Sequence, residues 1–392
     1  MKSIELQINR ITRLFWFIVA MIIRPLIKIN DKRIFCWAYG AKKYACNPRA
    51  LTEYILSNHA DEYEIYWGFN KDVDTSMLDN RIHIVRKYSF HYLYALYSSK
   101  FVFYNARNNP YDSMFIKKRE QKYIMMWHGP FALKKIEKDA CEQLSPKYLK
   151  YAQKDSAMCD LMLSNSKFFT KLIHDSFWYR GEILEKCSPR NDVFYNLNFK
   201  KKCYFNVRKS LGLSKDCKIV LYAPTFRSEN QTLDYYHINW TNVIPYFEKI
   251  LGGNVEILLR LHPNIAEIKG LETIMNYPHV HDVTKAPDIT DFLFAANAMI
   301  SDYTSAMFDF SLLQKPCFIY AVDKDEYDRG FYWNFEQLPF PFAESEKQLI
   351  SNIGSFDSDK YFHSLKKFQN EIWGLDEDGH ACEHLYNWMK AN

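Results

Sequence analysis

Residues 298–320 read AMISDYTSAMFDFSLLQKPCFIY, and this stretch decides the fold class. The apolar segment 298–300 runs straight into the polar run SDYTS, the helix AMFDFSLL follows, and residues 316–320 form another apolar segment. A strand, a helix and a second strand in this order are the repeating unit of a mostly parallel sheet. The sequence therefore predicts an α/β protein in which polar residues follow the ends of strands.

The same alternation extends through the rest of the chain. After the first predicted strand, Asn47-Pro48 starts a helix, because proline suits the first helical turn. Besides the two strands in 298–320, the chain has seven predicted strands, all short and apolar. The first in the chain is 33–38, and the others cover 64–69, 83–85, 100–104, 123–127, 218–222 and 256–261. They fall into two sets, so we predict two facing, doubly wound domains, each built on a parallel sheet.

The predicted domain boundaries follow from these two sets. A chain of 392 residues suits two domains, since one domain usually takes about 100–200 residues. We expect a helix at 1–30, an α/β domain at 31–195, a second at 203–345, and helices at 346–392 for which a return to the first domain stays open. The mostly polar segment 196–202, NLNFKKK, is the predicted linker.

Charge and cysteine content exclude several classes of protein. The formal net charge of +5 is too small for a dedicated nucleic-acid binder, which carries a basic stripe. It suits anionic substrates or lipid, or a chance excess on the surface. The nine cysteines form no CxxC pair, which argues against a disulfide framework and a structural zinc site. Free thiols in a reducing compartment are the simpler interpretation.

The apolar run LFWFIVAMII at residues 14–23 predicts contact with a membrane surface. It has ten residues, whereas crossing a bilayer takes about 20. No small-residue cleavage site follows, so we do not expect a signal peptide. Trp16 and the flanking cations suit a helix in the headgroup layer. Those cations are Lys2, Arg10, Arg13, Arg24 and Lys28. A buried helix of the first domain and a short spanning helix are the alternatives.

Polar residues gather directly after the predicted strands, at the edge where parallel sheets bind ligands. His128 follows the strand 123–127 and precedes Gly129, which lets a substrate approach the backbone. A histidine titrates near neutral pH, so His128 is a candidate general base for a hydroxyl group. A histidine that only caps a strand end is the alternative. His262 has the same placement in the second domain and is a candidate base or phosphate ligand.

The polar run at 301–305 predicts a phosphate site without a glycine-rich loop. A helix start leaves N–H groups unpaired, and Ser301, Asp302, Thr304 and Ser305 add polar groups. Helix capping alone is the alternative, although it needs only one such residue. Guanidinium groups match the oxygens of a diphosphate. The further candidate substrate ligands are Gly129, Arg190, Asn191, Thr225, Arg227 and Arg329.

No cofactor is predicted with certainty. A compact carboxylate cluster that demands a divalent metal is lacking, although Asp302 and Asp309 could contribute, so the metal requirement stays open. The pattern HACEH at 380–384 matches the H-x-x-E-H of some zinc peptidases, but little sequence follows it, and we expect an ordinary exposed helix. Neither a G-x-G-x-x-G nor a Walker phosphate loop is present.

Six motifs stand in a fixed order along the chain. They are WHG (127–129), PRND (189–192), YAPTFR (222–227), LRLHP (259–263), SDYTSAMFDFSLLQKP (301–316) and YDRGFY (327–332). With them the chain resembles the CDP-glycerol:poly(glycerophosphate) glycerophosphotransferases, the family of teichoic-acid primases and polymerases and their capsule relatives. CNPRALTEYIL at 46–56 is similar to an early helix of that family.

This resemblance implies a GT-B-like fold and peripheral attachment to the cytoplasmic face of a bacterial membrane with an anionic surface. It implies transfer of glycerol phosphate or ribitol phosphate from a CDP-polyol donor to a hydroxyl of a membrane-linked glycan or teichoic-acid acceptor, with release of CMP. The first domain would bind the acceptor, with His128 as the base. The second would bind the donor, with His262 and residues 301–305 near its phosphates. No nucleic-acid partner is expected.

Three rival hypotheses remain at this point. A GT-B glycosyltransferase with a nucleotide-sugar donor would share the fold and the anion-binding helix start. A catalytically silent membrane scaffold would not need the two histidines that follow strands. A metallopeptidase rests on the HACEH pattern alone.

Overall fold

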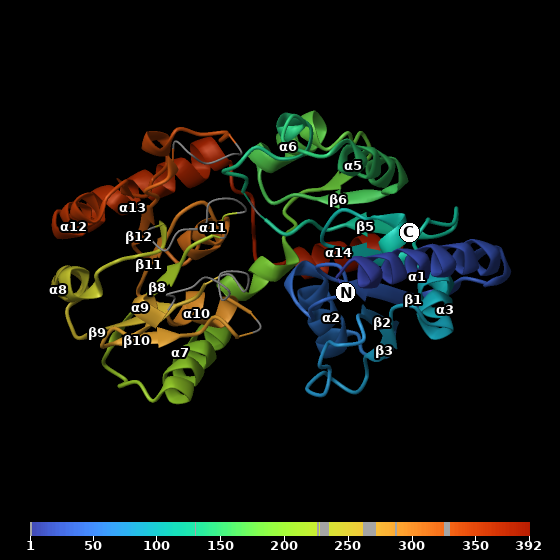
Figure 1. The fold of residues 1–392 in the computed structure, drawn as a ribbon, viewed down its shortest axis with the longest axis horizontal. Coiled ribbons are helices and arrows are strands. Elements are labelled where there is room, and N and C mark those ends of the chain that lie inside the picture. The colour runs from blue at the N-terminus through green and yellow to red at the C-terminus, as the bar shows by residue number, and fades with distance from the viewer. Residues whose placement is uncertain are drawn as a thin grey trace. The chain divides into compact units, whose positions relative to one another are not determined.

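The computed structural model describes residues 2–129, 131–225, 227, 235–261, 272–286, 288–324 and 330–392, without the side chains of residues 2–9 and 272 (Figure 1). The chain divides into two compact units. Unit 1 consists of Met1–His128, Ile136–Asp192 and Asp376–Asn392, and unit 2 of Gly129–Lys135 and Val193–Leu375. The first unit therefore takes chain from both ends of the sequence.

Unit 1 is built on a seven-stranded sheet of order β3-β2-β1-β4-β5-β6-β7, and all its strand pairs are parallel. The strands are β1 (Asn30–Trp37), β2 (Glu64–Phe69), β3 (His83–Arg86), β4 (Ser99–Tyr104), β5 (Lys122–Met125), β6 (Leu161–Leu163) and β7 (Glu182–Leu184). The central strands read as continuous apolar runs, because helices cover both faces of a parallel sheet.

The helices of unit 1 begin where the sequence supplies caps. Side chains of Ser89, Ser145 and Ser166 each accept a hydrogen bond from a backbone N–H in the first turn, which satisfies a group that the helix leaves unpaired. The helices are α1 (Lys2–Ile23), α2 (Cys46–Asn58), α3 (Phe90–Ser98), α4 (Pro110–Ser113), α5 (Pro146–Met158), α6 (Lys167–Ser176) and α14 (Ala381–Ala391). Short 3-10 turns cover Arg24–Leu26, Glu137–Ala140 and Pro189–Tyr195.

Unit 2 has a six-stranded sheet of order β10-β9-β8-β11-β12-β13, again with parallel pairs. Its strands are β8 (Lys218–Ala223), β9 (Val255–Leu259), β10 (Val280–Asp282), β11 (Ala298–Ser301), β12 (Cys317–Tyr320) and β13 (Phe342–Ala343). Its helices are α7 (Leu197–Leu211), α8 (Trp240–Leu251), α9 (Glu272–Met275), α10 (Thr290–Ala295), α11 (Ala306–Ser311), α12 (Glu346–Gly354) and α13 (Ser358–Lys367), with a π-helical turn at Phe368–Trp373 and a 3-10 turn at Phe335–Gln337.

One feature of the chain path differs from the predicted division, and another concerns a point that the sequence left open. The polar segment 196–202 is the start of α7 and not a linker, since the Asn196 side chain accepts hydrogen bonds from the N–H groups of Asn198 and Phe199 and so caps the helix. The three lysines of this segment are exposed to solvent on that helix. Of the carboxy-terminal helices, α12 and α13 belong to unit 2, whereas α14 belongs to unit 1, where Leu385 and Met389 enter the apolar core.

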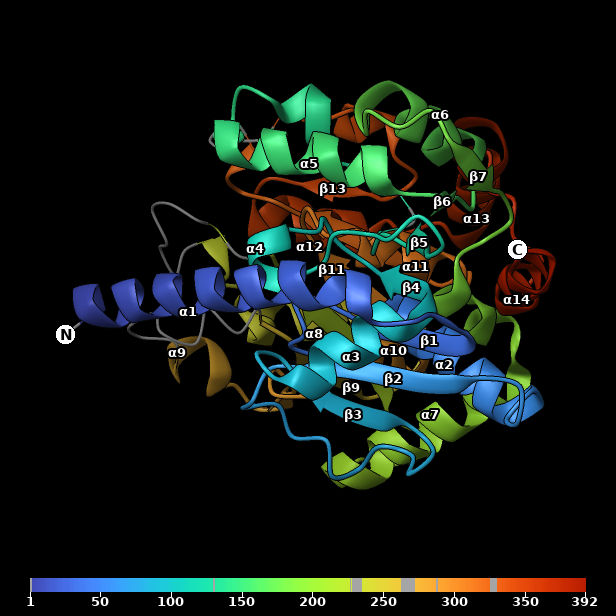
Figure 2. The same cartoon turned by 90° about the vertical axis from the view of Figure 1, so that its right-hand side faces the viewer.

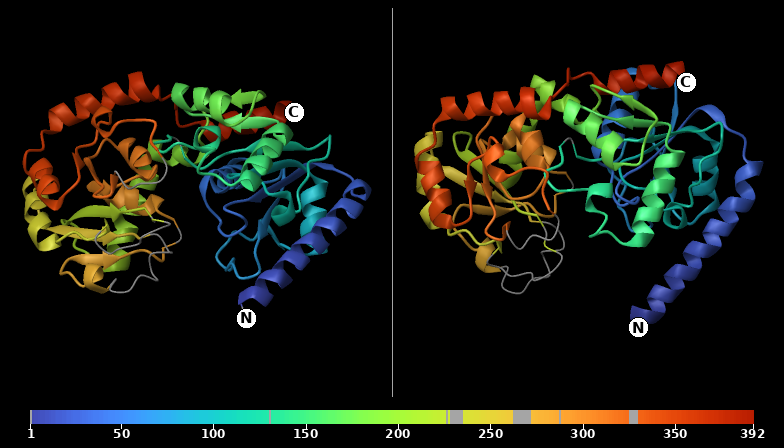
Figure 3. Two further views of the ribbon diagram at one scale, coloured as in Figure 1. Left: turned by 45° about the horizontal axis from the view of Figure 1, so that its top comes forward. Right: turned by 90° about the horizontal axis from the view of Figure 1, so that it is seen from above.

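The amino-terminal helix α1, labelled in Figure 2, has a buried side and an exposed side. On the inner side, the Trp16 ring lies 5.3 Å from Phe90 and the Phe17 ring lies 4.6 Å from Tyr111, while Ala20 is fully buried. The other side is apolar and exposed; it carries Ile11, Leu14, Phe15, Ile18 and Ile22. Figure 3 shows the helix along its whole length. No helix in the described part of the chain is long and apolar enough to cross a bilayer.

Candidate active site

Both sheets reverse their strand order at a central pair of neighbours. These pairs are β1 and β4 in unit 1, and β8 and β11 in unit 2. Connections that leave such a pair diverge to opposite faces, which opens a crevice outside the carboxyl ends of the strands, where ligands bind. The predicted site residues divide between these two edges: His128, Arg190 and Asn191 belong to unit 1, and the others that the structure describes belong to unit 2.

His128 is held in one tautomer by the loop after β4. Its Nδ1 lies 2.8 Å from the backbone oxygen of Asn105, and because a carbonyl can only accept, Nδ1 carries the proton of the neutral ring. The ring also packs edge-on against Tyr39, with 5.9 Å between the ring centroids. Burial lowers the pKa of His128 below its ordinary 6.5, the hydrogen bond to Asn105 opposes that effect, and the charge of Arg190 adds to it. Near neutral pH, Nε2 of His128 therefore carries an unprotonated lone pair, as the predicted base requires.

In the PRND motif, Arg190 lies near His128, whereas Asn191 and Asp192 form hydrogen bonds with the carboxy-terminal segment. The Arg190 N–H donates to the Asn47 side chain at 3.0 Å. By contrast, Asn191 is buried and its amide donates to Glu377 at 2.7 Å, while Asp192 accepts the first N–H groups of α14 at 2.9 and 2.8 Å. Asn191 and Asp192 therefore fasten the returning carboxy-terminal segment, and the role of Asn191 as a substrate ligand stays a prediction.

In unit 2, Arg227 is the centre of a buried ionic network. Its guanidinium donates to both oxygens of Asp323, at 2.6 and 2.8 Å, and to Asp302 at 2.6 Å. Asp302 also accepts the N–H of Thr225 at 2.9 Å, and Tyr303 donates its hydroxyl to Asp323 at 2.9 Å. Burial by itself would lower the pKa of Arg227, but the hydrogen bonds and charges of the two carboxylates raise it.

This network bears on two of the predictions. Arg227 and Asp302 bind each other and so shape the loops after β8 and β11, while their role as substrate ligands stays a prediction. Thr225 is held in place by its backbone N–H and is half-buried. Asp323 and Tyr303 were missed by the sequence analysis, although Asp323 follows the strand β12 and the rule that polar residues follow strands applies to it as well.

Of the four predicted phosphate ligands in the run at 301–305, Thr304 and Ser305 are the two that are partly exposed. Ser301 is fully buried and donates its hydroxyl to the backbone oxygen of Ala223 at 2.6 Å, so it joins β11 to β8. Thr304 and Ser305 are half-buried. The Thr304 oxygen accepts from the N–H of Ala306 at 3.3 Å, which leaves its hydroxyl proton for a ligand.

Gly129 belongs to the same unit as Ser305 and lies against it. A Cβ atom at Gly129 would meet the Ser305 Oγ at 3.4 Å and its Cβ at 3.6 Å, which is ordinary van der Waals contact. The chain then pairs with the segment after Arg329: Lys135 N–H donates to the Gly330 oxygen at 2.9 Å. The WHG motif is therefore divided between the units: His128 belongs to unit 1, whereas Gly129 belongs to unit 2, where it contacts Ser305.

Two predicted residues, His262 and Arg329, lie outside the described residues. In the part of the chain that is described, no group of three or more histidine, cysteine or acidic side chains could hold a metal ion. The HACEH histidines pair separately with carboxylates at the surface: His380 with Glu383 and His384 with Asp378. All nine cysteines are free thiols.

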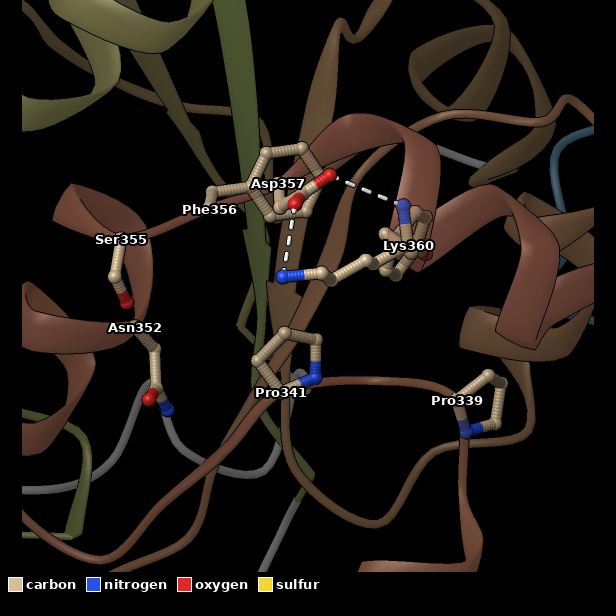
Figure 4. A pocket seen from close by; sticks show the side chains of 8 residues that line it. Pro339, Pro341, Asn352, Ser355, Phe356, Asp357 and Lys360 are labelled. Atoms are coloured by element: carbon tan, nitrogen blue, oxygen red, sulfur yellow. Dashed lines mark hydrogen bonds and ion pairs between the residues drawn. The ribbon is translucent and has the colours of Figure 1, made fainter.

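A surface pocket of about 300 Å³ lies elsewhere in unit 2 (Figure 4). Pro341, which precedes β13, and Tyr361, whose hydroxyl accepts the N–H of Cys317 at the start of β12, both line it. The pocket is therefore at the amino ends of these strands, at the edge of the sheet opposite to the predicted site residues. Ligands of doubly wound sheets bind at the carboxyl edge, so we assign this pocket no part in the chemistry.

Comparison with known proteins assigns the chain to a family. Residues 18–390 match the model of the CDP-Glycerol:Poly(glycerophosphate) glycerophosphotransferase family. The chain belongs to this family. The resemblance inferred from the six motifs is thereby confirmed.

Relatives of this chain act in teichoic-acid synthesis, as their names state. It is 28% identical to the teichoic acid glycerol-phosphate transferase of Staphylococcus aureus, over 96% of this chain and 98% of that protein. It is 29% identical to the teichoic acid poly(glycerol phosphate) polymerase of Staphylococcus epidermidis, over 91% of this chain but only 50% of that protein. The chain thus spans about half the length of the polymerase.

A solved structure of the wall teichoic acid polymerase TagF has the same fold. It superposes with a TM-score of 0.81 at 27% identity, over 100% of this chain and 95% of that chain. The expected GT-B-like fold of two parallel-sheet α/β domains is therefore confirmed. No comparison tests the predicted site residues, which rest on the geometry described above.

Proposed function

We propose that this protein transfers a polyol phosphate from a CDP-polyol to a hydroxyl group of a membrane-linked glycan or teichoic-acid acceptor and releases CMP. Glycerol phosphate is the first candidate unit, because the family and the two relatives above carry glycerol phosphate in their names. The observation that carries the proposal is the single tautomer of His128, which presents an unprotonated Nε2 from the carboxyl edge of a doubly wound sheet.

In the proposed reaction, Nε2 of His128 takes the proton of the acceptor hydroxyl as that oxygen attacks the phosphorus attached to the polyol. The new P–O bond forms while the bond from this phosphorus to the oxygen of CMP breaks, and CMP leaves with the bonding electron pair. The lowered pKa of His128 keeps the ring neutral before the attack, and the Asn105 carbonyl then stabilises the imidazolium through Nδ1.

On the donor side, we assign the phosphates to the hydroxyl groups of Thr304 and Ser305, with Gly129 leaving room beside them. Arg227 and Asp302 hold the loop that presents these groups. Such transfer depends mostly on positioning and on stabilising the charge of the phosphate oxygens. Arg190, His262 and Arg329 remain candidate cationic ligands from the sequence.

We further propose that the outer face of α1 attaches the protein to the cytoplasmic face of the membrane. Five apolar side chains at positions 11, 14, 15, 18 and 22 are exposed along one side of this helix. Arg10, Arg13 and Lys28 are exposed around them, so apolar burial and attraction to anionic lipid would act together. Attachment in this way brings the protein to an acceptor that is itself held in the membrane.

A donor assay tests the proposed reaction. Purified protein is incubated with a lipid-linked, short poly(glycerophosphate) acceptor and, in separate reactions, with CDP-glycerol, CDP-ribitol or a UDP-sugar. We expect CMP release and an acceptor that gains the mass of one or more polyol phosphates. Transfer of a sugar with release of UDP, and none from either CDP-polyol, would replace the proposal with the nucleotide-sugar alternative.

A further inference from the structure

Asn47, in the first turn of α2, makes three hydrogen bonds with the two loops that carry the unit 1 site. Its side-chain nitrogen donates to the backbone oxygens of Met126 at 2.9 Å and Trp127 at 3.1 Å. Its side-chain oxygen accepts the N–H of Arg190 at 3.0 Å. Asn47 is 4% exposed, so water competes little for these groups.

The two carbonyls that Asn47 binds stand just before the proposed base. Met126 still donates its N–H to the Tyr104 oxygen at 2.8 Å, so the strand pairing of β5 with β4 ends there. Trp127 then adopts a positive φ of 49°, which costs free energy for a residue with a side chain. A rigid helix that binds the carbonyls on both sides of this turn fixes the direction in which His128 leaves the sheet.

The same amide sets where Arg190 stands relative to His128. The charge of Arg190 acts on the His128 ring, and the Arg190 backbone N–H donates to the Asn47 side chain. We propose that Asn47 is a positioning residue for the transfer reaction, which holds His128 and Arg190 in fixed register through one side-chain amide. This inference rests on the proposed function, because it treats His128 as the base.

Two substitutions of Asn47 distinguish the hydrogen bonds of its amide group from the space that its side chain fills. Asn47→Asp keeps the shape and an accepting oxygen but loses both donated hydrogen bonds, and Asn47→Ala removes all three. The matched control is Asn58→Ala at the other end of the same helix, where the side chain is exposed and donates only to the Tyr54 oxygen at 2.9 Å. Circular dichroism checks folding, and Asn47→Asp carries the test if Asn47→Ala does not fold.

The kinetic readout is the division between kcat and KM. With CDP-glycerol and the lipid-linked acceptor, we expect Asn47→Asp to lower kcat by about 10- to 100-fold, since displacing a catalytic group by about 1 Å has this effect. The KM for CDP-glycerol should stay within about twofold, because the proposed donor groups belong to unit 2. Asn58→Ala should match the wild type in both parameters.

The second readout needs no substrate. The ring of His128 is followed by NMR with labelled histidine and assigned through His128→Gln. In the wild type we expect the Nδ1–H tautomer and a pKa below 6.5. The groups that face this ring are the Asn105 carbonyl, the rings of Tyr39 and Trp127, and the charge of Arg190. Asn47→Asp should raise the pKa of His128, because a carboxylate comes near the ring, and the tautomer should become mixed.

The outcomes separate the two proposals. An unchanged titration and tautomer of His128 in folded Asn47→Asp would overturn the positioning role, whatever happens to kcat. A mixed tautomer together with a lowered kcat supports it. If the wild type transfers no polyol phosphate but the tautomer of His128 still becomes mixed in Asn47→Asp, the proposed function fails and the positioning of His128 by Asn47 stands.

Discussion

Replacing Leu14, Phe15 and Ile18 with glutamine should release the protein from lipid vesicles while the fold stays intact. These side chains are 51%, 57% and 49% exposed, so about half of each is available to enter a membrane. Complete burial of such a side chain is worth about 1.5–3 kcal/mol. Half of that is about 1 kcal/mol each, or about 3 kcal/mol for the three. At about 1.4 kcal/mol per tenfold, membrane partitioning should fall about 100-fold.

The assay is co-sedimentation with vesicles that contain anionic lipid, over a range of lipid concentrations. Leu197→Gln is the matched control, because Leu197 is 73% exposed on α7 of unit 2 and should not affect binding. Deleting the helix would be a poorer test, since Trp16 and Phe17 pack on unit 1. High salt should weaken binding of the intact protein only in part, because ions screen the charges and not the apolar area. Sedimentation of the triple variant equal to that of the wild type would refute the reasoning.

Three further predictions concern the two units. His128→Gln should lower turnover by about 10²–10⁴-fold. In the wild type, the acid limb of the pH profile of kcat/KM should lie below pH 6.5, because a lowered pKa keeps His128 neutral where an ordinary histidine is charged. An acid limb above pH 6.5 would contradict this. Replacing Thr304 and Ser305 with alanine should weaken CDP-glycerol binding by about 1–3 kcal/mol in calorimetry; unchanged affinity would return them to helix capping. Arg227→Met should lower the free energy of unfolding in urea by about 3–5 kcal/mol, because two buried carboxylates lose their cation. Arg81→Ala, at an exposed ion pair, should cost much less, because solvent screens exposed charges, and equal losses in the two variants would show that the Arg227 network does not stabilise the fold.

The sequence by itself determined the fold class, the family and most of the long strands. Central strands such as 64–69 and 100–104 are apolar on both faces, so they stand out as continuous runs, and the polar residues after them indicate the edge where ligands bind. The strands β6, β7, β10 and β13 were missed. They have two or three residues each, too few for any periodicity, and neighbouring strands decide that they pair.

Only the tertiary structure decided what each polar residue does. Arg227 and Asp323 are 96 positions apart in the chain, and Asn47 and Arg190 are 143 apart. The sequence alone does not show whether the guanidinium of an arginine in a motif binds a phosphate or two buried carboxylates. The difference depends on partners that folding brings within hydrogen-bonding distance, and burial then makes those contacts persist because water no longer competes for them.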